Sequence, residues 1–153
     1  MLIRPYKSND LDEIVALFRR SVRELASSDY TVQQIAAWAP ETPEPPSWSQ
    51  RLASELVVVC EIGGRIAGFA RLERNGHLDL LYVHPEFARR GVASHLCDYL
   101  EEWAVRNRVG RMFTEASVTA KPFFEHRGFR ATREQTALPQ GVPISNFRME
   151  RTL

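Results

Sequence analysis

Cysteine and net charge are both scarce in this sequence. The two cysteines, Cys60 and Cys97, lie in apolar segments and have no second Cys or His at the spacing of a zinc site. Twenty basic and 19 acidic side chains leave a formal net charge of +1, which is too small to draw the protein to nucleic acid or to a membrane surface. We therefore expect two buried, reduced thiols, no bound metal and no nucleic-acid partner.

Long hydrophobic runs are also missing. No stretch approaches the ~18 consecutive apolar residues of a membrane span, and residues 1–10 lack the apolar core of a signal peptide. The sequence thus predicts a cytoplasmic protein without a membrane partner. Its 153 residues, 44% of them hydrophobic, are enough for one domain over 1–153 with a single ample core.

Proline is unevenly distributed. Four of the nine prolines lie between residues 40 and 50, which predicts a stiff loop before a helical turn at 48–55. Apolar spacing elsewhere predicts helices and strands. Helices are expected at 10–29, 30–39, 90–106 and 119–127, and strands at 2–6, 55–62, 65–73, 76–83, 109–117, 130–138 and 144–153. This order favours an α/β (α+β) fold, with a mixed central sheet of about seven strands and helices on both faces.

The turn Arg89-Arg90-Gly91 stands at the entrance of the helix expected at 90–106. A helix start leaves about four backbone N–H groups without partners and carries partial positive charge, so it can bind an anion. Gly91 would let a ligand come close to the backbone, and the two arginines add charge that suits phosphate oxygens. The alternative is a solvated basic turn whose glycine serves only the geometry.

Two segments resemble motifs of the GCN5-related N-acetyltransferases (GNAT). They are "LYVHPEFARRGVASHL" at 81–96 and "KPFFEHRGF" at 121–129, separated by one helix and one strand as in that family. With "YTVQQIAAWA" at 30–39, the resemblance is closest to the YafP-like branch and covers the chain nearly end to end. It implies the GNAT-like acyl-CoA N-acyltransferase fold, N-acetyltransferase activity and acetyl-CoA (coenzyme A) as cofactor. The turn at 89–91 is then expected to hold the pyrophosphate of acetyl-CoA.

The resemblance also implies where the cofactor lies. The backbone of 81–83 is expected to run along the pantetheine arm, with the Val83 N–H facing the thioester oxygen, where a fixed donor stabilises an oxyanion. Arg89 falls at the family's usual second glycine, which calls for a turn without positive φ. Contacts to the cofactor are expected from Leu81, Tyr82, Val83, Arg89, Arg90, Gly91, Val92, Ala93, Ser94, Ser117 and Phe124.

Phe124 stands where the family often has a tyrosine that protonates the leaving thiolate. Phenylalanine has no proton to give, so Phe124 is expected to pack on the cofactor near the sulfur. A water, Tyr30 or Tyr82 is left as the proton donor. Ser117 either caps the following helix or reaches the cofactor.

Period-2 alternation on strand 76–83 places His77, Asp79, Leu81 and Val83 on one face. Because the resemblance puts the acceptor amine near this face, His77 is a candidate catalytic base. Asp79 would orient His77 or bind a cationic substrate. Alternatively, His77 lies in solvent and Asp79 pairs with an arginine such as Arg71.

Tyr30 and Trp38 are candidate substrate-binding residues, because the family's acceptor site usually lies near the proline-rich loop. Core packing is the alternative for Trp38. The leading hypothesis is direct transfer of an acetyl group to an amine of a small molecule or an exposed amino group, by a monomer or homodimer. The other hypothesis, which Phe124 favours, is a non-catalytic acyl-CoA-binding sensor or regulatory module.

Overall fold

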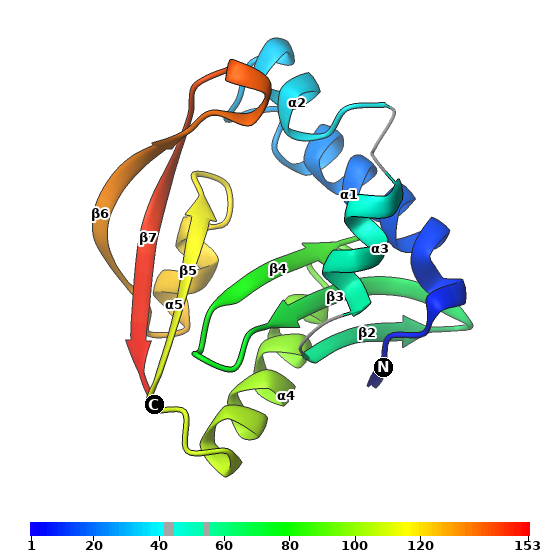
Figure 1. The fold of residues 1–153 in the computed structure, drawn as a ribbon, viewed down its shortest axis with the longest axis vertical. Helices are drawn as coiled ribbons and strands as arrows, with labels where there is room; N and C mark the ends of the chain where they lie inside the picture. Colours follow the sequence, from blue (N-terminus) through cyan, green and yellow to red (C-terminus); the bar gives the residue numbers. More distant parts are fainter. Residues whose placement is uncertain (42–44, 54–55) are drawn as a thin grey trace.

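The computed structural model describes residues 1–41, 45–53 and 56–153, and its elements follow the order expected from the sequence (Figure 1). The helices are α1 (Leu11–Leu25), α2 (Val32–Trp38), α3 (Pro45–Ala53), α4 (Val92–Arg106) and α5 (Lys121–His126). The strands are β1 (Leu2–Pro5), β2 (Leu56–Ile62), β3 (Arg65–Leu72), β4 (Leu78–Val83), β5 (Arg111–Ser117), β6 (Arg130–Ala137) and β7 (Ile144–Thr152).

The proline-rich segment is more helical than expected. Part of the predicted loop, residues 42–44, lies outside the described residues, and so does the end of the predicted turn at 54–55. Between them α3 begins at Pro45, three residues before the expected turn. Proline is compatible with the first turn of a helix because the N–H that it lacks has no intrahelical partner there.

The seven strands form two sheets that diverge from one another. One sheet has the order β1-β2-β3-β4 and the other the order β5-β7-β6, and all pairs within them are antiparallel. A single parallel bridge between His77 and Phe113 joins the sheets at one end. Beyond it β4 and β5 separate like the arms of a V (Figure 1). The expected α+β fold with seven strands and helices on both faces is confirmed, but the expected single mixed sheet is opened into two between these two strands.

Local signals in the sequence account for the first sheet and for α2. Gly63 and Gly64 both have positive φ, as a tight two-residue hairpin between β2 and β3 requires. The backbone N–H of Gln34 donates to Thr31 Oγ1 over 3.1 Å and the Thr31 N–H donates to Gln34 Oε1 over 2.9 Å. This reciprocal capping box fixes the start of α2 where the sequence predicts it.

A β-bulge interrupts β4 at Asp79. Leu72 pairs with Leu78 and Arg71 pairs with Leu80, so Asp79 is an extra residue without a partner on β3. Leu78 consequently packs with Leu81 on the α4 side of the sheet, whereas Leu80 packs on the α1 side. The predicted strict alternation along 76–83 was therefore wrong across residue 79, because a bulge reverses the faces of the residues that follow it.

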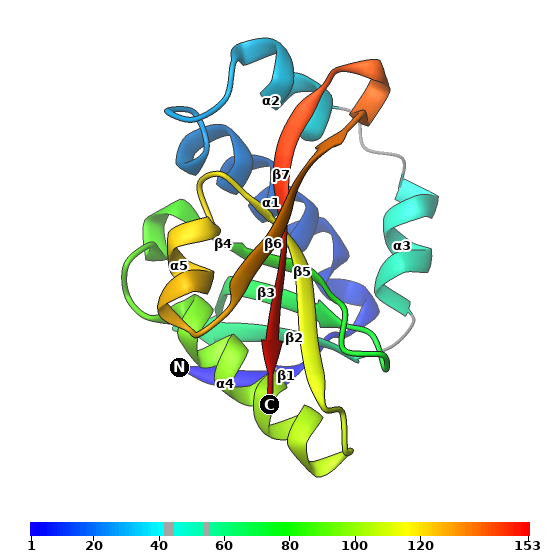
Figure 2. The same cartoon turned by 90° about the vertical axis from the view of Figure 1, so that its left-hand side faces the viewer.

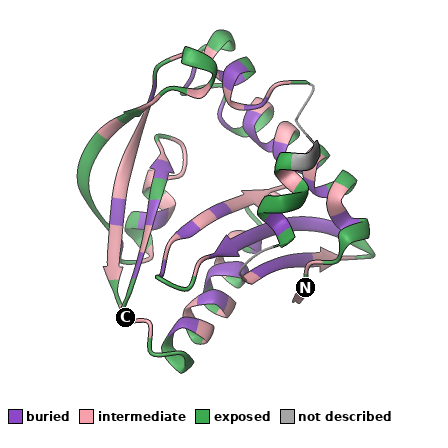
Figure 3. Ribbon diagram, in the orientation of Figure 1, coloured by how far each residue is buried: buried purple, intermediate pink, exposed green. Residues whose placement is uncertain are grey.

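The first sheet is covered on both faces. Val58 and Cys60 pack toward α4, and Val57 and Val59 pack toward α1, which explains the unbroken apolar run of β2. In Figure 2 the strands β5, β6 and β7 cross one another in front of the first sheet. In the order β5-β7-β6, β6 is the edge strand far from β4. Buried residues follow β2, β3 and the inner faces of α1 and α4, while β6 is largely exposed (Figure 3).

Both cysteines are free and buried, as predicted. None of the helices in the described ranges is long and apolar enough to cross a membrane.

Gly76 lies where the two sheets touch, and we expect Gly76→Ala to destabilise the fold by about 2–3 kcal/mol. Its φ is +95°, and a Cβ there would lie 2.0 Å from the Arg111 carbonyl oxygen. Gly64→Ala is the matched control, because Gly64 has a φ of +78° but nothing within 4 Å of its Cβ position. Urea unfolding should give about 1 kcal/mol for the control. Equal losses of unfolding free energy in the two variants would contradict the close approach of residue 76 to the Arg111 carbonyl.

Candidate active site between β4 and β5

The opening between β4 and β5 holds a cleft of about 650 Å³, which we call the β4–β5 cleft. Its walls come from β4, the start of α4, β5, α5 and the second half of α1, with Trp38 of α2 at one side. Ten of the eleven residues expected to contact the cofactor line it: Leu81, Tyr82, Val83, Arg89, Gly91, Val92, Ala93, Ser94, Ser117 and Phe124. Arg90 does not line the cleft, and its guanidinium lies 5.5 Å from the centroid of the Phe87 ring.

The start of α4 faces this cleft with open backbone. Gly91 is the N-cap residue with a φ of +83°, and a Cβ there would meet nothing closer than His95 Nδ1 at 3.7 Å. The N–H groups of residues 92–94 belong to the first turn, which has no preceding turn to accept from them. The cleft therefore has N–H donors and a positive helix end on one wall.

Arg89 corrects one expectation. Its φ is +61°, so the turn does have the left-handed conformation that the glycine of the family would favour, and the prediction of a turn without positive φ was wrong. An exposed arginine adopts this conformation at a cost of about 1 kcal/mol, because its Cβ crowds the backbone. Arg89 lies between the short turn at Pro85–Phe87 and the start of α4 at Val92.

We expect Arg89→Gly to raise the free energy of unfolding by about 0.5–1 kcal/mol, since glycine relieves this strain. Arg90→Gly is the control at the next position, where φ is not positive. It should lower stability by a similar amount, because glycine then only adds freedom to the unfolded chain. Thermal or urea unfolding of both variants measures the difference. A fall in the free energy of unfolding for both variants would show that Arg89 is not strained.

The β4 edge that faces β5 offers backbone groups to the cleft. The His84 N–H donates to the Ala67 carbonyl on β3 over 2.8 Å. Successive N–H groups of an extended strand point to opposite edges, so the Val83 N–H points toward the cleft. Nearer the bridge, the Thr114 hydroxyl donates to the Leu78 carbonyl over 2.8 Å. Side-chain bonding thus replaces strand pairing where the sheets begin to separate.

A second cavity of about 600 Å³ lies on the α1 side of β4, and we call it the aromatic cavity. Its aromatic side chains come from α1, α2, α3, β4 and the segment before α2: Phe18, Tyr30, Trp38, Trp48 and Tyr82. It includes both predicted substrate-binding residues, Tyr30 and Trp38. Five residues line both cavities, which therefore meet at them: Trp38, Asp79, Tyr82, Glu115 and Ser117.

Asp79 lies at this junction but is held by two arginines. Arg51 of α3 donates to both of its oxygens over 2.9 Å, and Arg71 of β3 donates to one of them over 2.9 Å. Burial alone would raise the pKa of Asp79, but the hydrogen bonds and charge of Arg51 and the charge of Arg71 outweigh it and lower the pKa. The alternative of an Asp79–Arg71 ion pair is therefore confirmed. An ionised carboxylate shared in this way is a weak proton acceptor.

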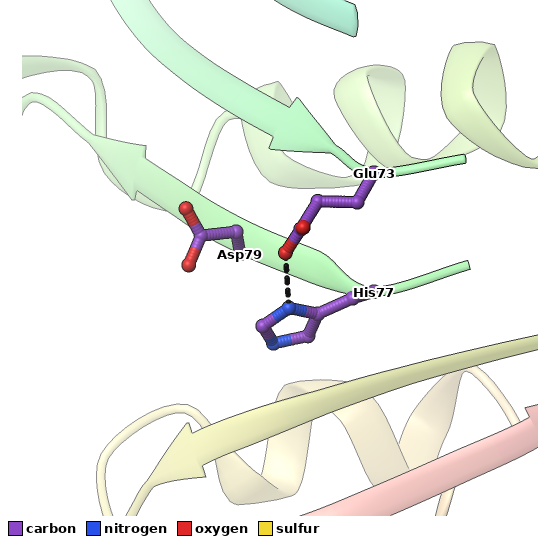
Figure 4. A group of neighbouring side chains, drawn as sticks. All are labelled: Glu73, His77 and Asp79. Carbon is purple, nitrogen blue, oxygen red and sulfur yellow. Dashed lines mark hydrogen bonds and ion pairs between the residues drawn. The ribbon is translucent and has the colours of Figure 1, made fainter. Parts of the chain in front are cut away.

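His77 lies beside Asp79 and bridges two glutamates. Its Nδ1 is 2.5 Å from Glu73 Oε1 and its Nε2 is 2.7 Å from Glu115 Oε1; Figure 4 shows the ring pointing at Glu73. The ring is stacked on Phe113 and lines neither cavity. With a carboxylate at each ring nitrogen and no place on either cavity wall, His77 is not positioned to take a proton from a bound amine.

Glu73, His77 and Asp79 offer ligand atoms within 4.8 Å of one another (Figure 4). Arg71 Nη1 lies 3.6 Å from Glu73 and 2.9 Å from Asp79. A cation placed among the three would be repelled by this guanidinium.

The predicted proton donors differ in how their hydroxyls are used. The Tyr30 hydroxyl donates to the Ser145 carbonyl over 3.0 Å and accepts from the Val118 N–H over 2.7 Å. Burial raises the pKa of Tyr82, and the neighbouring Trp38 side chain only partly opposes this rise, so Tyr82 keeps a phenolic proton at neutral pH. Phe124 is buried and packs edge-on against its aromatic neighbours. Ser117 accepts from the Ala120 N–H over 3.0 Å and so caps the turn before α5, while also lining the cleft.

Among the charged residues that line the aromatic cavity, three were not predicted from the sequence: Glu115, Arg51 and Arg19. Glu115 had a usable signal, because alternation along β5 buries Met112, Thr114 and Ala116 and leaves Glu115 on the opposite face. Arg51 and Arg19 lie on helices whose packing against the sheet depends on the tertiary structure. No local pattern distinguishes them from other helix arginines.

Residues 26–151 match the acetyltransferase (GNAT) domain family. The uncharacterized N-acetyltransferase YafP of Escherichia coli (strain K12) is 38% identical over 148 residues, which is 96% of this chain and 93% of that protein. The crystal structure of a GCN5-related N-acetyltransferase from Rhodopseudomonas palustris superposes with a TM-score of 0.96 at 32% identity, over 99% of this chain and 95% of the other. PaiA N-acetyltransferase from Thermoplasma acidophilum, in complex with coenzyme A, has the same fold at 18% identity, with a TM-score of 0.82 over 99% and 98% of the two chains. The chain therefore belongs to the GNAT family of N-acetyltransferases, as the motifs at 81–96 and 121–129 indicate.

Proposed function

We propose that this N-acetyltransferase takes its acetyl group from acetyl-CoA and transfers it directly to an amine. The observation that carries the proposal is the meeting of two cavities at five shared residues. One cavity has a helix start for an anion, and the other has the size and apolar lining of a small-molecule site. The coenzyme A bound to the similarly folded PaiA supports the choice of donor.

The β4–β5 cleft fits acetyl-CoA chemically. Open space around Gly91 and the first-turn N–H groups of α4 suit the pyrophosphate. The exposed edge of β4 suits a pantetheine arm that bonds to it as an added strand. When bound, acetyl-CoA would supply an activated acyl carbon. In this arrangement the Val83 N–H donates to the thioester oxygen as negative charge develops on it.

Glu115 is the residue best placed to receive the proton of the amine. It lines both cavities, its side chain is 35% exposed, and His77 fixes one of its oxygens. We assign proton acceptance to Glu115 and a positioning role to His77, which holds the carboxylate toward the junction. Asp79 then positions Arg51 at the wall of the aromatic cavity.

Tyr82 is the proposed proton donor to the leaving thiolate. The amine nitrogen forms a bond to the acetyl carbon, the carbon–sulfur bond breaks, and the thiolate takes the phenolic proton. Tyr82 retains that proton at neutral pH because burial raises its pKa. Tyr30 is less suitable, since its hydroxyl already donates to a carbonyl.

Direct transfer is favoured over an acetylated protein. Burial raises the pKa of Cys60, and it raises the pKa of Cys97 to about 12, so neither thiol ionises readily at neutral pH. Neither cysteine lines the β4–β5 cleft.

The proposal is tested by following release of the free coenzyme A thiol with a panel of amines. We expect amine-dependent release well above the hydrolysis seen without amine, and acetylated amine in equal amount by mass spectrometry. A non-catalytic sensor would bind acetyl-CoA without release of thiol. Binding without turnover across the panel would therefore overturn the assignment as a transferase acting on small amines.

A further inference from the structure

Arg19 is a cation on the wall of the aromatic cavity with no partner in the described part of the chain. It lies on α1, and no ion pair or hydrogen bond joins its guanidinium to another described residue. Its Nε is covered and has no hydrogen-bond partner. Three other arginines also have a covered and unbonded Nε, but each binds a carboxylate through another nitrogen: Arg71, Arg127 and Arg148. The guanidinium of Arg19 is therefore left for a ligand.

The other charged side chains on the wall of this cavity already have partners. Its two described acids are Asp79, which binds Arg51 and Arg71, and Glu115, which binds His77. The lining thus has no spare carboxylate to attract a polycation, and Arg19 adds positive charge. An acceptor with several ammonium groups would be repelled, whereas one with a carboxylate would be attracted.

The remaining lining specifies the body of the acceptor. Phe18 is stacked on Tyr82 at a centroid distance of 4.8 Å and meets Trp48 edge-on at 4.9 Å. Such a surface binds apolar or aromatic groups. Asn146 of β7 brings a second polar atom to this wall, a covered Oδ1 without a hydrogen-bond partner. Arg19 and Asn146 thus add a cationic and an amide side chain to a lining that is otherwise largely aromatic and apolar.

We propose that the acceptor is a small amine that also carries a carboxylate on an apolar or aromatic body, of the kind found in an amino acid, and that Arg19 binds this carboxylate. The inference rests on the proposed transfer to amines. Guanidinium and carboxylate groups match as paired hydrogen bonds, so Arg19 fixes the acceptor at one end. Its amine then lies free to reach Glu115 at the junction.

Four probes and two variants test this. Phenylalanine, phenylalaninamide and phenethylamine share one aromatic body and differ in the carboxylate, and spermidine is the polycation. For wild type we expect kcat/KM to be about 10- to 100-fold higher for phenylalanine than for phenethylamine. Arg19→Gln should remove about that factor for phenylalanine and change phenethylamine by less than about 3-fold. Arg20→Gln is the matched control, because the neighbouring Arg20 binds Glu24 and Glu86 outside the cavity.

The outcomes separate this inference from the proposed function. Equal kcat/KM for the acid, the amide and the amine, or an equal loss for all of them in Arg19→Gln, would overturn the role of Arg19. A preference for spermidine would do the same. Turnover of none of the four probes also overturns it, and an acetyl-CoA titration then shows whether the proposed donor falls as well. If Arg19→Gln does not fold, the wild-type ratio of kcat/KM for phenylalanine to that for phenethylamine still tests the preference for a carboxylate. Arg19→Lys, which keeps the positive charge, should then retain part of that preference.

Discussion

Glutamate at position 91 is expected to weaken acetyl-CoA binding by at least roughly 100-fold. The N-terminus of α4 offers unpaired N–H groups to the β4–β5 cleft, and Gly91 leaves the approach to them open. A carboxylate there takes up those donors itself and repels the pyrophosphate. Calorimetric titration of acetyl-CoA into wild type and Gly91→Glu measures the loss.

Gly91→Ala separates charge from backbone strain in this test. Any side chain must adopt the φ of +83° at residue 91, but a Cβ has no neighbour within 3.7 Å. Alanine should therefore lower stability by about 1 kcal/mol and leave the affinity within about 5-fold of wild type, since it adds no charge. Similar losses of affinity in the two variants would mean that the turn acts through its shape. A folded Gly91→Glu with wild-type affinity would exclude this turn as the phosphate site.

Glu115→Gln is expected to lower kcat by about 100-fold or more while acetyl-CoA affinity stays within about 2-fold. Glutamine keeps an oxygen at the same place for His77 but cannot accept the proton of the amine. Steady-state kinetics across a pH series provide the measurement. Wild-type kcat/KM should rise with pH as the amine loses its proton, and the variant should follow the same rise at a much lower level.

Glu73→Gln is the control for this variant. Glu73 binds the other nitrogen of His77, but it lines neither cavity. We expect its kcat to fall less than about 10-fold, because it can act only by positioning His77. If the two glutamine variants lose activity equally, the cluster works as a structural unit. If Glu115→Gln retains wild-type kcat, the proton acceptor lies elsewhere.

The parts of the fold that depend on neighbouring residues in the chain were predictable. Two consecutive glycines at 63–64 require a tight hairpin, and Thr31 with Gln34 can form a capping box without any tertiary contact. Gly91 before an amphipathic helix likewise indicated an open helix start. These signals, together with the motif resemblance, placed ten of the eleven expected residues around the β4–β5 cleft.

The remaining features depend on contacts between distant segments. The bulge at Asp79 is defined by the pairing of β4 with β3, and the side chain of Asp79 is fixed by Arg51, 28 residues away. Period-2 alternation carries no signal for such an extra residue. The positive φ of Arg89 and the His77–Glu115 contact are likewise set by tertiary packing. For this reason the sequence indicated His77 as the base, while the structure places Glu115 together with Asp79 at the junction.

The most direct test of the central claim is the initial-velocity pattern when acetyl-CoA and an amine are varied together. Two cavities that meet at Asp79, Tyr82 and Glu115 allow both substrates to be bound at once, so double-reciprocal plots should give intersecting lines. Parallel lines would show that acetyl is first transferred to the protein. Release of the free coenzyme A thiol at a rate that does not depend on the amine concentration would contradict catalysis at this junction.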